Sequence, residues 1–254
     1  MSLPWRFDPL GAAGALVPVS GTRGVFLFSG STPVSSGMTI SGGTVGTGFP
    51  GNDLRVYQRG KAVDQFVVAG GALRVSSGGV ARETAVAGGV MYVSAGGKCV
   101  SATVVTSGDG IRVFSGGAAS DTTVSSGGSM NISSGGVASD TTVLAGGRLY
   151  FRDTGSGSGM DVSGILAIFG GIAEAASITA GGSALVNDLG AIQNATVLSG
   201  GRMLISSGGV ASDTTVSSGG TMRISSGGLA VNVTSMTGAS VTVLEGGTIT
   251  PPLN

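Results

Sequence analysis

The sequence predicts an all-β protein, a right-handed parallel β-helix (β-solenoid) of about 11 turns with about 19 residues in each turn. Three observations predict it. Glycine pairs recur at alternating intervals of 8 and 11 residues, and the segments between them alternate apolar with polar residues. Glycine makes up 50 of the 254 residues, yet 41% of the chain is apolar, which is too much for a disordered chain. The right hand is expected because parallel crossovers strongly favour it.

The short segment of each repeat reads Gly-Gly-x-apolar-x-apolar, which is the period-two pattern of a strand with one buried face. Stacking each strand on its equivalent in the next turn would bury a continuous core that one repeat alone cannot form. The first apolar column comprises Leu54, Leu73, Met91, Ile111, Met130, Leu149, Leu166, Ala184, Met203, Met222 and Val241. The second comprises Val56, Val75, Val93, Val113, Ile132, Phe151, Ile168, Val186, Ile205, Ile224 and Val243.

The long segment supplies two further inward columns, so each turn is expected to hold about three short strands joined at glycine-bearing corners. The step between residues 146 and 163 is shorter than the others and indicates a local irregularity. The small column comprises Ala62, Ala81, Cys99, Ala119, Ala138, Ala173, Ile192, Ala211 and Ala230. The β-branched column comprises Val67, Val86, Val104, Val124, Val143, Ile178, Val197 and Val216.

The amino-acid composition argues against several classes of function. The chain has no histidine, which excludes Ser–His and Cys–His catalysis and most transition-metal sites. The net charge of zero gives no electrostatic case for nucleic acid or an anionic membrane, and the single cysteine, Cys99, cannot form an internal disulfide. No cofactor is expected. No run of about 20 apolar residues could span a membrane, and the first residues do not form a convincing secretion signal.

One column of the long segment is rich in acids, and it admits two interpretations. A row of carboxylates would bind calcium or cleave a polysaccharide, whereas a corner position would favour Asp and Asn because they tolerate left-handed backbone. We favour the corner, since the column mixes acids with other residues and the calcium-binding nonapeptide pattern is absent. No catalytic or metal site is therefore assigned. The column comprises Asp64, Glu83, Ser101, Asp121, Asp140, Ala175, Asn194, Asp213 and Asn232.

The outward column between the two apolar columns contains arginines and tyrosines that form a candidate contact row for a glycan or an acidic partner. The alternative is a solvated sheet surface that keeps the strands soluble. The candidate contact row comprises Arg55, Arg74, Tyr92, Arg112, Tyr150 and Arg223.

Three regions are expected along the chain: an N-terminal cap with irregular first turns over 1–50, the repeats over 51–247, and a tail over 248–254. Capping residues are needed because an open end exposes unpaired strands. Trp5 and Phe7 are expected in the cap, and the prolines near the C-terminus would discourage further strand pairing.

Alternation of Gly-Gly-x-apolar-x-apolar-Ser-Ser-Gly-Gly with Val-Ala-Ser-Asp-Thr-Thr-Val resembles the passenger repeats of AIDA-type autotransporter adhesins. The resemblance covers roughly residues 51–247 and is strongest at 116–147 and 200–228, where "ISSGGVASDTTV" occurs twice. It implies a right-handed β-helix on a Gram-negative surface that mediates adhesion to host cells and self-association between bacteria.

The resemblance also implies modification by a heptosyltransferase on Ser or Thr within the repeats. The alternative is that these serines are ordinary turn residues. The candidate acceptors are Ser76, Ser77, Ser125, Ser126, Ser133, Ser134, Ser206, Ser207, Ser217, Ser218, Ser225 and Ser226.

The leading hypothesis is thus an extracellular, non-enzymatic adhesin module, whose partners are like molecules on neighbouring cells or a host surface glycan or protein. A self-assembling filament or scaffold subunit is the alternative, favoured by low charge and full-length regularity. A polysaccharide lyase or hydrolase is a third hypothesis, with a suitable scaffold but without a distinctive catalytic set.

Overall fold

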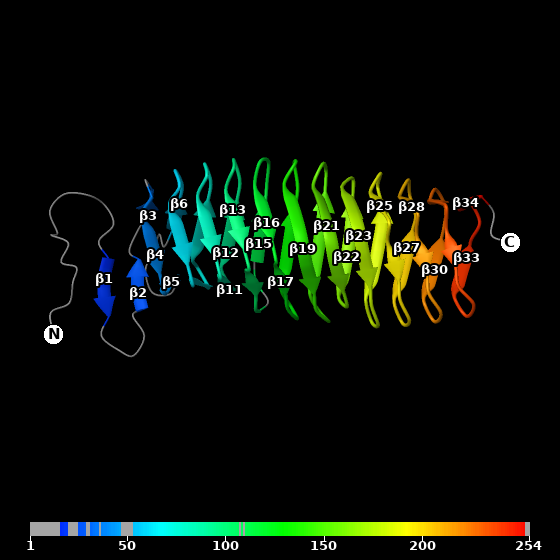
Figure 1. Cartoon of the computed structure of the whole chain (residues 1–254), viewed down its shortest axis with the longest axis horizontal. Coiled ribbons are helices and arrows are strands. Elements are labelled where there is room, and N and C mark those ends of the chain that lie inside the picture. Colours follow the sequence, from blue (N-terminus) through cyan, green and yellow to red (C-terminus); the bar gives the residue numbers. More distant parts are fainter. Residues whose placement is uncertain are drawn as a thin grey trace.

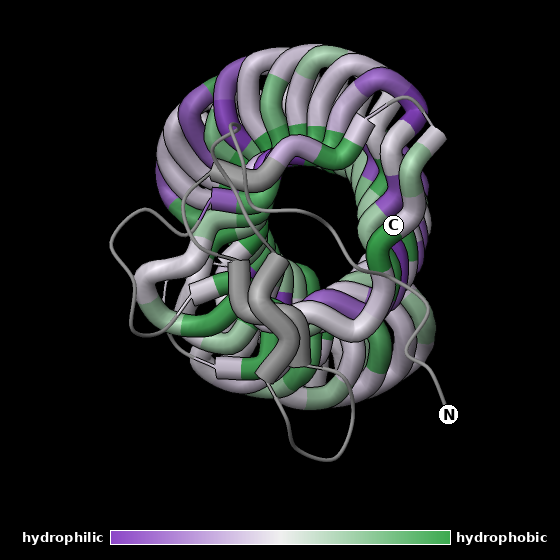
Figure 2. The backbone as a smooth tube through the Cα atoms, turned by 90° about the vertical axis from the view of Figure 1, so that its left-hand side faces the viewer, coloured by the Kyte–Doolittle hydropathy of each residue, from purple (hydrophilic) through white to green (hydrophobic). Residues whose placement is uncertain are grey.

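The computed structural model describes residues 16–19, 25–28, 31–35, 37–46, 53–106, 108 and 110–251, and these residues form strands and turns with no helix among them. Consecutive turns lie side by side along one long axis (Figure 1). Seen along that axis, the turns superimpose as one ring, with apolar residues concentrated on the inner side (Figure 2). The expected all-β parallel solenoid of about 11 turns is confirmed.

One strand from each turn enters a 12-stranded sheet. Its strands are β3 (Ser31–Val34), β6 (Asp53–Val56), β9 (Ala72–Val75), β12 (Val90–Val93), β15 (Gly110–Val113), β18 (Ser129–Ile132), β20 (Arg148–Arg152), β22 (Ile165–Phe169), β24 (Ser183–Asn187), β27 (Arg202–Ile205), β30 (Thr221–Ile224) and β33 (Ser240–Val243).

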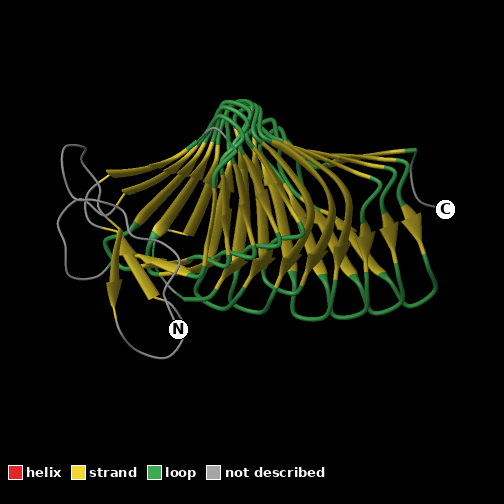
Figure 3. Ribbon diagram, turned by 60° about the vertical axis from the view of Figure 1, so that its left-hand side comes forward, coloured by secondary structure: helices red, strands yellow, loops and turns green. Residues whose placement is uncertain are grey.

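The remaining strands of the turns form a 22-stranded sheet, and the corners between strands gather along the edges of the coil (Figure 3). Its strands are β1 (Leu16–Val19), β2 (Val25–Phe28), β4 (Thr39–Ser41), β5 (Gly43–Val45), β7 (Lys61–Val63), β8 (Phe66–Val68), β10 (Val80–Arg82), β11 (Ala85–Ala87), β13 (Lys98–Val100), β14 (Thr103–Val104), β16 (Ala118–Ser120), β17 (Thr123–Val124), β19 (Val137–Val143), β21 (Ser156–Val162), β23 (Ile172–Ile178), β25 (Ala191–Gln193), β26 (Thr196–Val197), β28 (Val210–Ser212), β29 (Thr215–Val216), β31 (Leu229–Val231), β32 (Thr234–Ser235) and β34 (Thr248–Thr250).

Strand pairing between turns is parallel and joins equivalent residues. Leu73 pairs with Met91 and Val75 with Val93, as the repeat predicts. The exception among the described strands is the antiparallel pair β1–β2, and β2 then pairs in parallel with β5. Equivalent positions of successive turns therefore form rows along the coil, with about 4.8 Å between neighbours in a row.

The core contains the four predicted inward columns, whose members are fully buried through most of the coil, together with the residues that follow the acid-rich column, such as Ala102 and Met160. The short step near residue 157 is a complete turn. Gly157 takes the place of the alanine in the small column, between Ala138 and Ala173, and Val162 completes the β-branched column. A Cβ at Gly157 would lie 2.6 Å from Cζ of Phe151, so the glycine provides the space that the largest core side chain occupies.

The paired glycines at the corners have two different physical roles. Gly78 has a φ of 79°, a left-handed conformation that most residues avoid. A Cβ on the following residue, Gly79, would overlap the carbonyl oxygen of Val56 in the preceding turn. One glycine therefore turns the chain, and the other permits the close contact between turns.

The acid-rich column forms the third corner, and the structure confirms its predicted geometry. Its residues all have φ between 50° and 55°, including Asp121 at 51° and Ala175 at 51°. The next residue points inward. Its side chain often bonds back across the bend, as in the Thr122 Oγ1 donation to the Ser120 carbonyl at 3.4 Å. The Asp-Thr pair of the repeat thus encodes a bend, which Thr122 and Thr214 close with an internal hydrogen bond. The hydroxyl of Thr141 at the equivalent position is buried without a partner among the described residues.

The described strands between residues 31 and 46 pair in register with the turn that follows, and β34 pairs with β31. The region boundaries proposed at residues 50 and 247 stay predictions. Trp5 and Phe7 lie outside the described residues. Within the described part of the chain, no helix is long and apolar enough to cross a membrane.

We expect Asp121→Val to lower the free energy of unfolding by about 1 kcal/mol, because a β-branched side chain is strained in the left-handed region. Asp121→Gly and Asp121→Asn should leave it nearly unchanged, since both residues accept this backbone. Urea denaturation of the three variants measures the difference. An equal loss in Asp121→Asn and Asp121→Val would show that the carboxylate itself, rather than the bend, stabilises this corner.

Candidate functional site

The outer face of the 12-stranded sheet concentrates positive charge, although the whole chain is neutral. We call the outward surface of strands β6 to β33, with the residue that follows each strand, the basic face. It carries seven arginines, which are more than half of the 13 Lys and Arg residues of the chain. It also carries three acids: Asp53 in β6, and Asp153 and Asp188, which follow β20 and β24. The arginines are Arg55, Arg74, Arg112, Arg148, Arg152, Arg202 and Arg223.

At the N-terminal end of this face, Asp53 holds two arginines. Its Oδ2 accepts a hydrogen bond from Nε of Arg55 at 2.9 Å, and its Oδ1 accepts one from Nε of Arg74 at 3.0 Å. The two guanidinium groups lie on adjacent turns and are exposed, so each pair contributes about 1 kcal/mol or less to stability. The main effect of Asp53 is to orient these two side chains.

Arginines and aromatic rings form stacks on the next turns. The guanidinium of Arg74 lies 4.5 Å from the ring centroid of Tyr92, and that of Arg112 lies 5.8 Å from it. Phe114 stacks on Tyr92 with centroids 6.4 Å apart and ring planes 14° apart. Cation–π contacts of this kind contribute about 0.5–1 kcal/mol at exposed sites and restrict the arginine side chains.

A second stack occurs near the middle of the coil. Arg152 lies between two rings, 5.2 Å from the centroid of Tyr150 and 5.2 Å from that of Phe169. Tyr150 and Phe169 are half-buried while Arg152 is exposed. The guanidinium therefore remains accessible to a ligand while its side chain packs on the rings.

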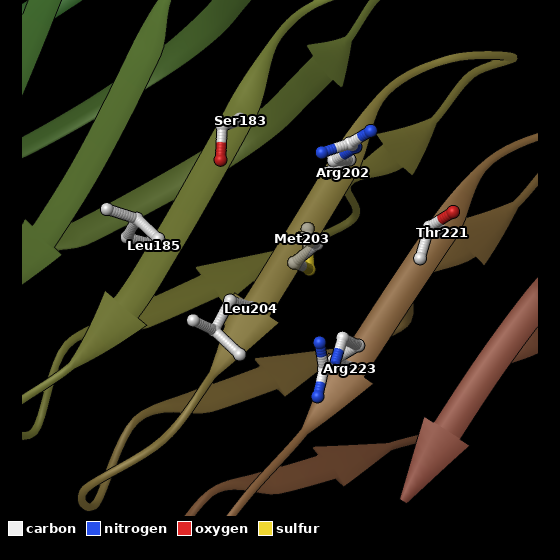
Figure 4. A pocket seen from close by; sticks show the side chains of 7 residues that line it. All are labelled: Ser183, Leu185, Arg202, Met203, Leu204, Thr221 and Arg223. Atoms are coloured by element: carbon white, nitrogen blue, oxygen red, sulfur yellow. The ribbon is translucent and has the colours of Figure 1, made fainter.

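A shallow recess of about 380 Å³ lies on the same face over β24, β27 and β30 (Figure 4). Its rim combines two guanidinium groups and two hydroxyls with two leucines. Within the described residues, neither Arg202 nor Arg223 forms an ion pair. The rim residues are Ser183, Leu185, Arg202, Leu204, Thr221 and Arg223.

The structure places all six residues of the predicted contact row in one register column of this face, from Arg55 to Arg223. It brings Arg74, Tyr92 and Arg112 into contact, whereas Arg223 is separated from Tyr150 by the turns of β22, β24 and β27. Sequence reasoning missed Arg148, Arg152 and Arg202. The period-two alternation could have found them. Arg148 and Arg152 lie two residues from Tyr150, and Arg202 lies two residues from Leu204, which pairs with Arg223 in the same outward column.

The serine pairs lie at turns along the edges of both sheets. In all six predicted pairs the first serine is half-buried and the second is exposed. The hydroxyl of Ser225, a first serine, donates to the Ile205 carbonyl of the preceding turn at 3.3 Å. The second serines are therefore the ones that face solvent.

Metal binding and thiol chemistry are two further candidate functions of the described residues. Among the described residues, no group of three or more His, Cys, Asp or Glu side chains could hold a metal ion. Cys99 is buried between Ala81 and Ala119 of the neighbouring turns. Burial disfavours the thiolate and raises the pKa of Cys99 from 9.0 to about 12.

This parallel coil, with its repeated outer columns, defines the protein as a glycine-rich β-solenoid. A similar solved structure is described as "Crystal structure of TibC-catalyzed hyper-glycosylated TibA55-350 fragment", with a TM-score of 0.84 and 34% identity over 89% of this chain and 82% of that one. The chain therefore belongs to the family of TibA, the AIDA-type autotransporter passengers. No protein-family model matches the chain, and no curated protein matches it.

We expect the Cys99 thiol to resist thiol reagents in the folded protein at pH 8 and to react once the chain is unfolded. Because its folded pKa is raised, its contribution to stability is complete below pH 9 and is lost as the pH rises towards 12. The wild type should lose about 1 kcal/mol between pH 8 and pH 10 relative to Cys99→Ala, a change that the neighbouring alanines should accommodate. Urea denaturation at both pH values measures this, and parallel losses in the two proteins would contradict it.

Proposed function

We propose that this chain is an extracellular, non-enzymatic adhesin module of a bacterial cell surface. The observation that supports the proposal is the basic face, where the same outward positions repeat turn after turn on a stiff coil. Weak contacts made by such rows add up, because after the first contact the others form at high effective concentration. Membership in the family of TibA supports the same function.

The proposal that the chain is not an enzyme rests on the acid-rich column, whose residues lie at the bends. Their acids are explained by the left-handed backbone, which Ser101, Ala175 and Asn194 adopt in the same column with φ between 51° and 55°. A position that accepts these residues has a conformational role that needs no carboxylate chemistry. The filament and polysaccharide-enzyme alternatives stay hypotheses. Electron microscopy of the purified protein tests the first, and release of sugar ends from polysaccharides tests the second.

Beads coated with residues 1–254 should bind cultured cells or clump with one another, and added salt should weaken both effects because exposed charges are screened. Arg74→Gln/Arg223→Gln should reduce bead binding several-fold. The matched control Lys61→Gln/Arg82→Gln removes the same charge from exposed positions of the 22-stranded sheet and should not reduce it. Absence of binding and clumping by wild-type beads at every salt concentration would refute the adhesin function.

We also propose that the coil is a substrate of a heptosyltransferase, and that the acceptors are the exposed second serines. TibA is described as hyper-glycosylated in a TibC-catalyzed reaction, and this chain offers serines of suitable exposure at its turns. The first serines are poorer acceptors because their hydroxyls are half-buried, and that of Ser225 is engaged by the Ile205 carbonyl.

The protein purified from its native host should show intact-mass additions in steps of one sugar. The variant Ser207→Ala/Ser218→Ala/Ser226→Ala should lose up to three of these additions. Its matched control Ser206→Ala/Ser217→Ala/Ser225→Ala, which changes the first serine of the same pairs, should lose none. An unmodified wild-type mass would refute the modification, and an equal loss in both variants would refute the choice of serine.

A further inference from the structure

We propose that the basic face binds a linear acidic polysaccharide, whose carboxylate or sulfate groups pair with the arginines along successive turns. This inference rests on the proposed adhesin function and names the ligand of its contact face.

Charge is separated between the two sheets. The basic face has seven arginines and three acids, whereas the described outer surface of the 22-stranded sheet and its bends has seven acids and three cations. A surface with an excess of one charge raises the local concentration of an oppositely charged polymer and accelerates its association. The acids of the second surface are Asp64, Glu83, Asp121, Asp140, Asp161, Glu174 and Asp213, and its cations are Lys61, Arg82 and Lys98.

The kind of cation and its spacing also favour a linear anionic polymer. Every cation of the basic face is an arginine, whose planar guanidinium can donate two parallel hydrogen bonds to one carboxylate or sulfate. Equivalent positions lie about 4.8 Å apart along the coil, so Arg74 and Arg112 are separated by two turns, or about 10 Å. A linear polymer lying along the axis would meet these donors in sequence, whereas a compact anion would engage only one or two.

The aromatic rings of the basic face stack against arginines of the same chain. Tyr92 has guanidinium groups on it at 4.5 and 5.8 Å and Phe114 stacked beside it. A nucleic acid base would need an open ring face on which to stack, and here the arginines of the chain itself occupy that position. The stacks therefore present fixed guanidinium groups to a ligand, which favours an acidic sugar chain over single-stranded nucleic acid.

The recess over β24, β27 and β30 combines the features of a site for an acidic sugar. Arg202 and Arg223 flank the exposed Leu204 there, and Ser183 and Thr221 contribute hydroxyls (Figure 4). An acidic sugar combines an anionic group, hydroxyls and an apolar C–H surface, which correspond to these three features. The recess provides a defined position for one sugar unit within the longer charged path.

A second copy of the chain is the competing occupant, because its acid-bearing bends repeat with the same spacing as the arginines. Those acids are interrupted, however: between Asp140 and Asp213 the consecutive bends hold Gly159, Ala175 and Asn194. The hydroxyls and leucines of the recess also have no evident counterpart in a row of bend carboxylates. An acidic polysaccharide therefore matches more features of the basic face than a second copy of the chain does.

The test measures binding of the full chain to heparin as a sulfated probe, to alginate as a carboxylated probe, and to neutral dextran and duplex DNA. We expect the wild type to bind heparin and alginate with a strong salt dependence and not to bind dextran. Arg202→Gln/Arg223→Gln should weaken binding about tenfold or more, because it removes two guanidinium groups that donate charge-assisted hydrogen bonds, and a tenfold change corresponds to about 1.4 kcal/mol. Lys61→Gln/Arg82→Gln removes the same charge from the other sheet. It should weaken binding no more than about twofold, because exposed charges that do not contact the ligand contribute little.

Equal losses in the two double variants, or equal binding to duplex DNA and heparin, would overturn the proposal. Dimers that form without polymer and are lost in Arg202→Gln/Arg223→Gln would assign the face to a second copy and also overturn it. Circular dichroism of each variant verifies that the coil is intact. Coated beads that still bind cells but not the acidic polysaccharides would refute only the ligand, whereas beads that bind nothing would refute the adhesin function as well.

Discussion

Hydrogen bonding of each turn to the equivalent backbone of the next is the constraint on which the rest of the structure depends. It fixes the rise at about 4.8 Å and forces identical positions into contact. An inward position must therefore accept the same kind of side chain in every turn, as the pairing of Leu73 with Met91 and of Val75 with Val93 illustrates. A residue that fits poorly must be compensated within its own turn, and Gly157 opposite Phe151 is such a compensation.

The same constraint explains the corners. The chain must change direction within one or two residues without moving away from the neighbouring turn, so the corners adopt positive φ and allow backbone to approach backbone. Glycine satisfies this requirement at the turns, as at Gly78 and Gly79, whereas Asp, Asn and an inward Thr satisfy it at the bends. The most conspicuous motif of the sequence is therefore mainly conformational.

The outward positions can carry binding residues, because the stacking of the turns restricts their side chains less than those of the core and the corners. Because each turn shifts these positions by the same small distance, a residue type repeated in the sequence becomes a line on the surface. Arginine on one sheet and acids on the other divide a neutral chain into faces of opposite sign. Lines of this kind suit a ligand that is itself linear and repetitive. Because the coil is stiff, its binding surface does not have to lose conformational entropy when the ligand binds.

The sequence by itself determined the period, the parallel register, the buried columns and the corner role of the acids, because in a stacked coil those features are local and repeat with the turn. It also placed Arg55, Arg74, Tyr92, Arg112, Tyr150 and Arg223 on one face. Only the tertiary structure decided that Gly157 and Val162 complete the short turn, since their alignment depends on space left by Phe151. The stacks of Arg152 on Tyr150 and Phe169, the recess at Arg202 and Arg223, and the exposure of one serine in each pair likewise depended on it. These features arise between turns, from rotamers and neighbours about 19 residues away, which an alternating pattern does not encode.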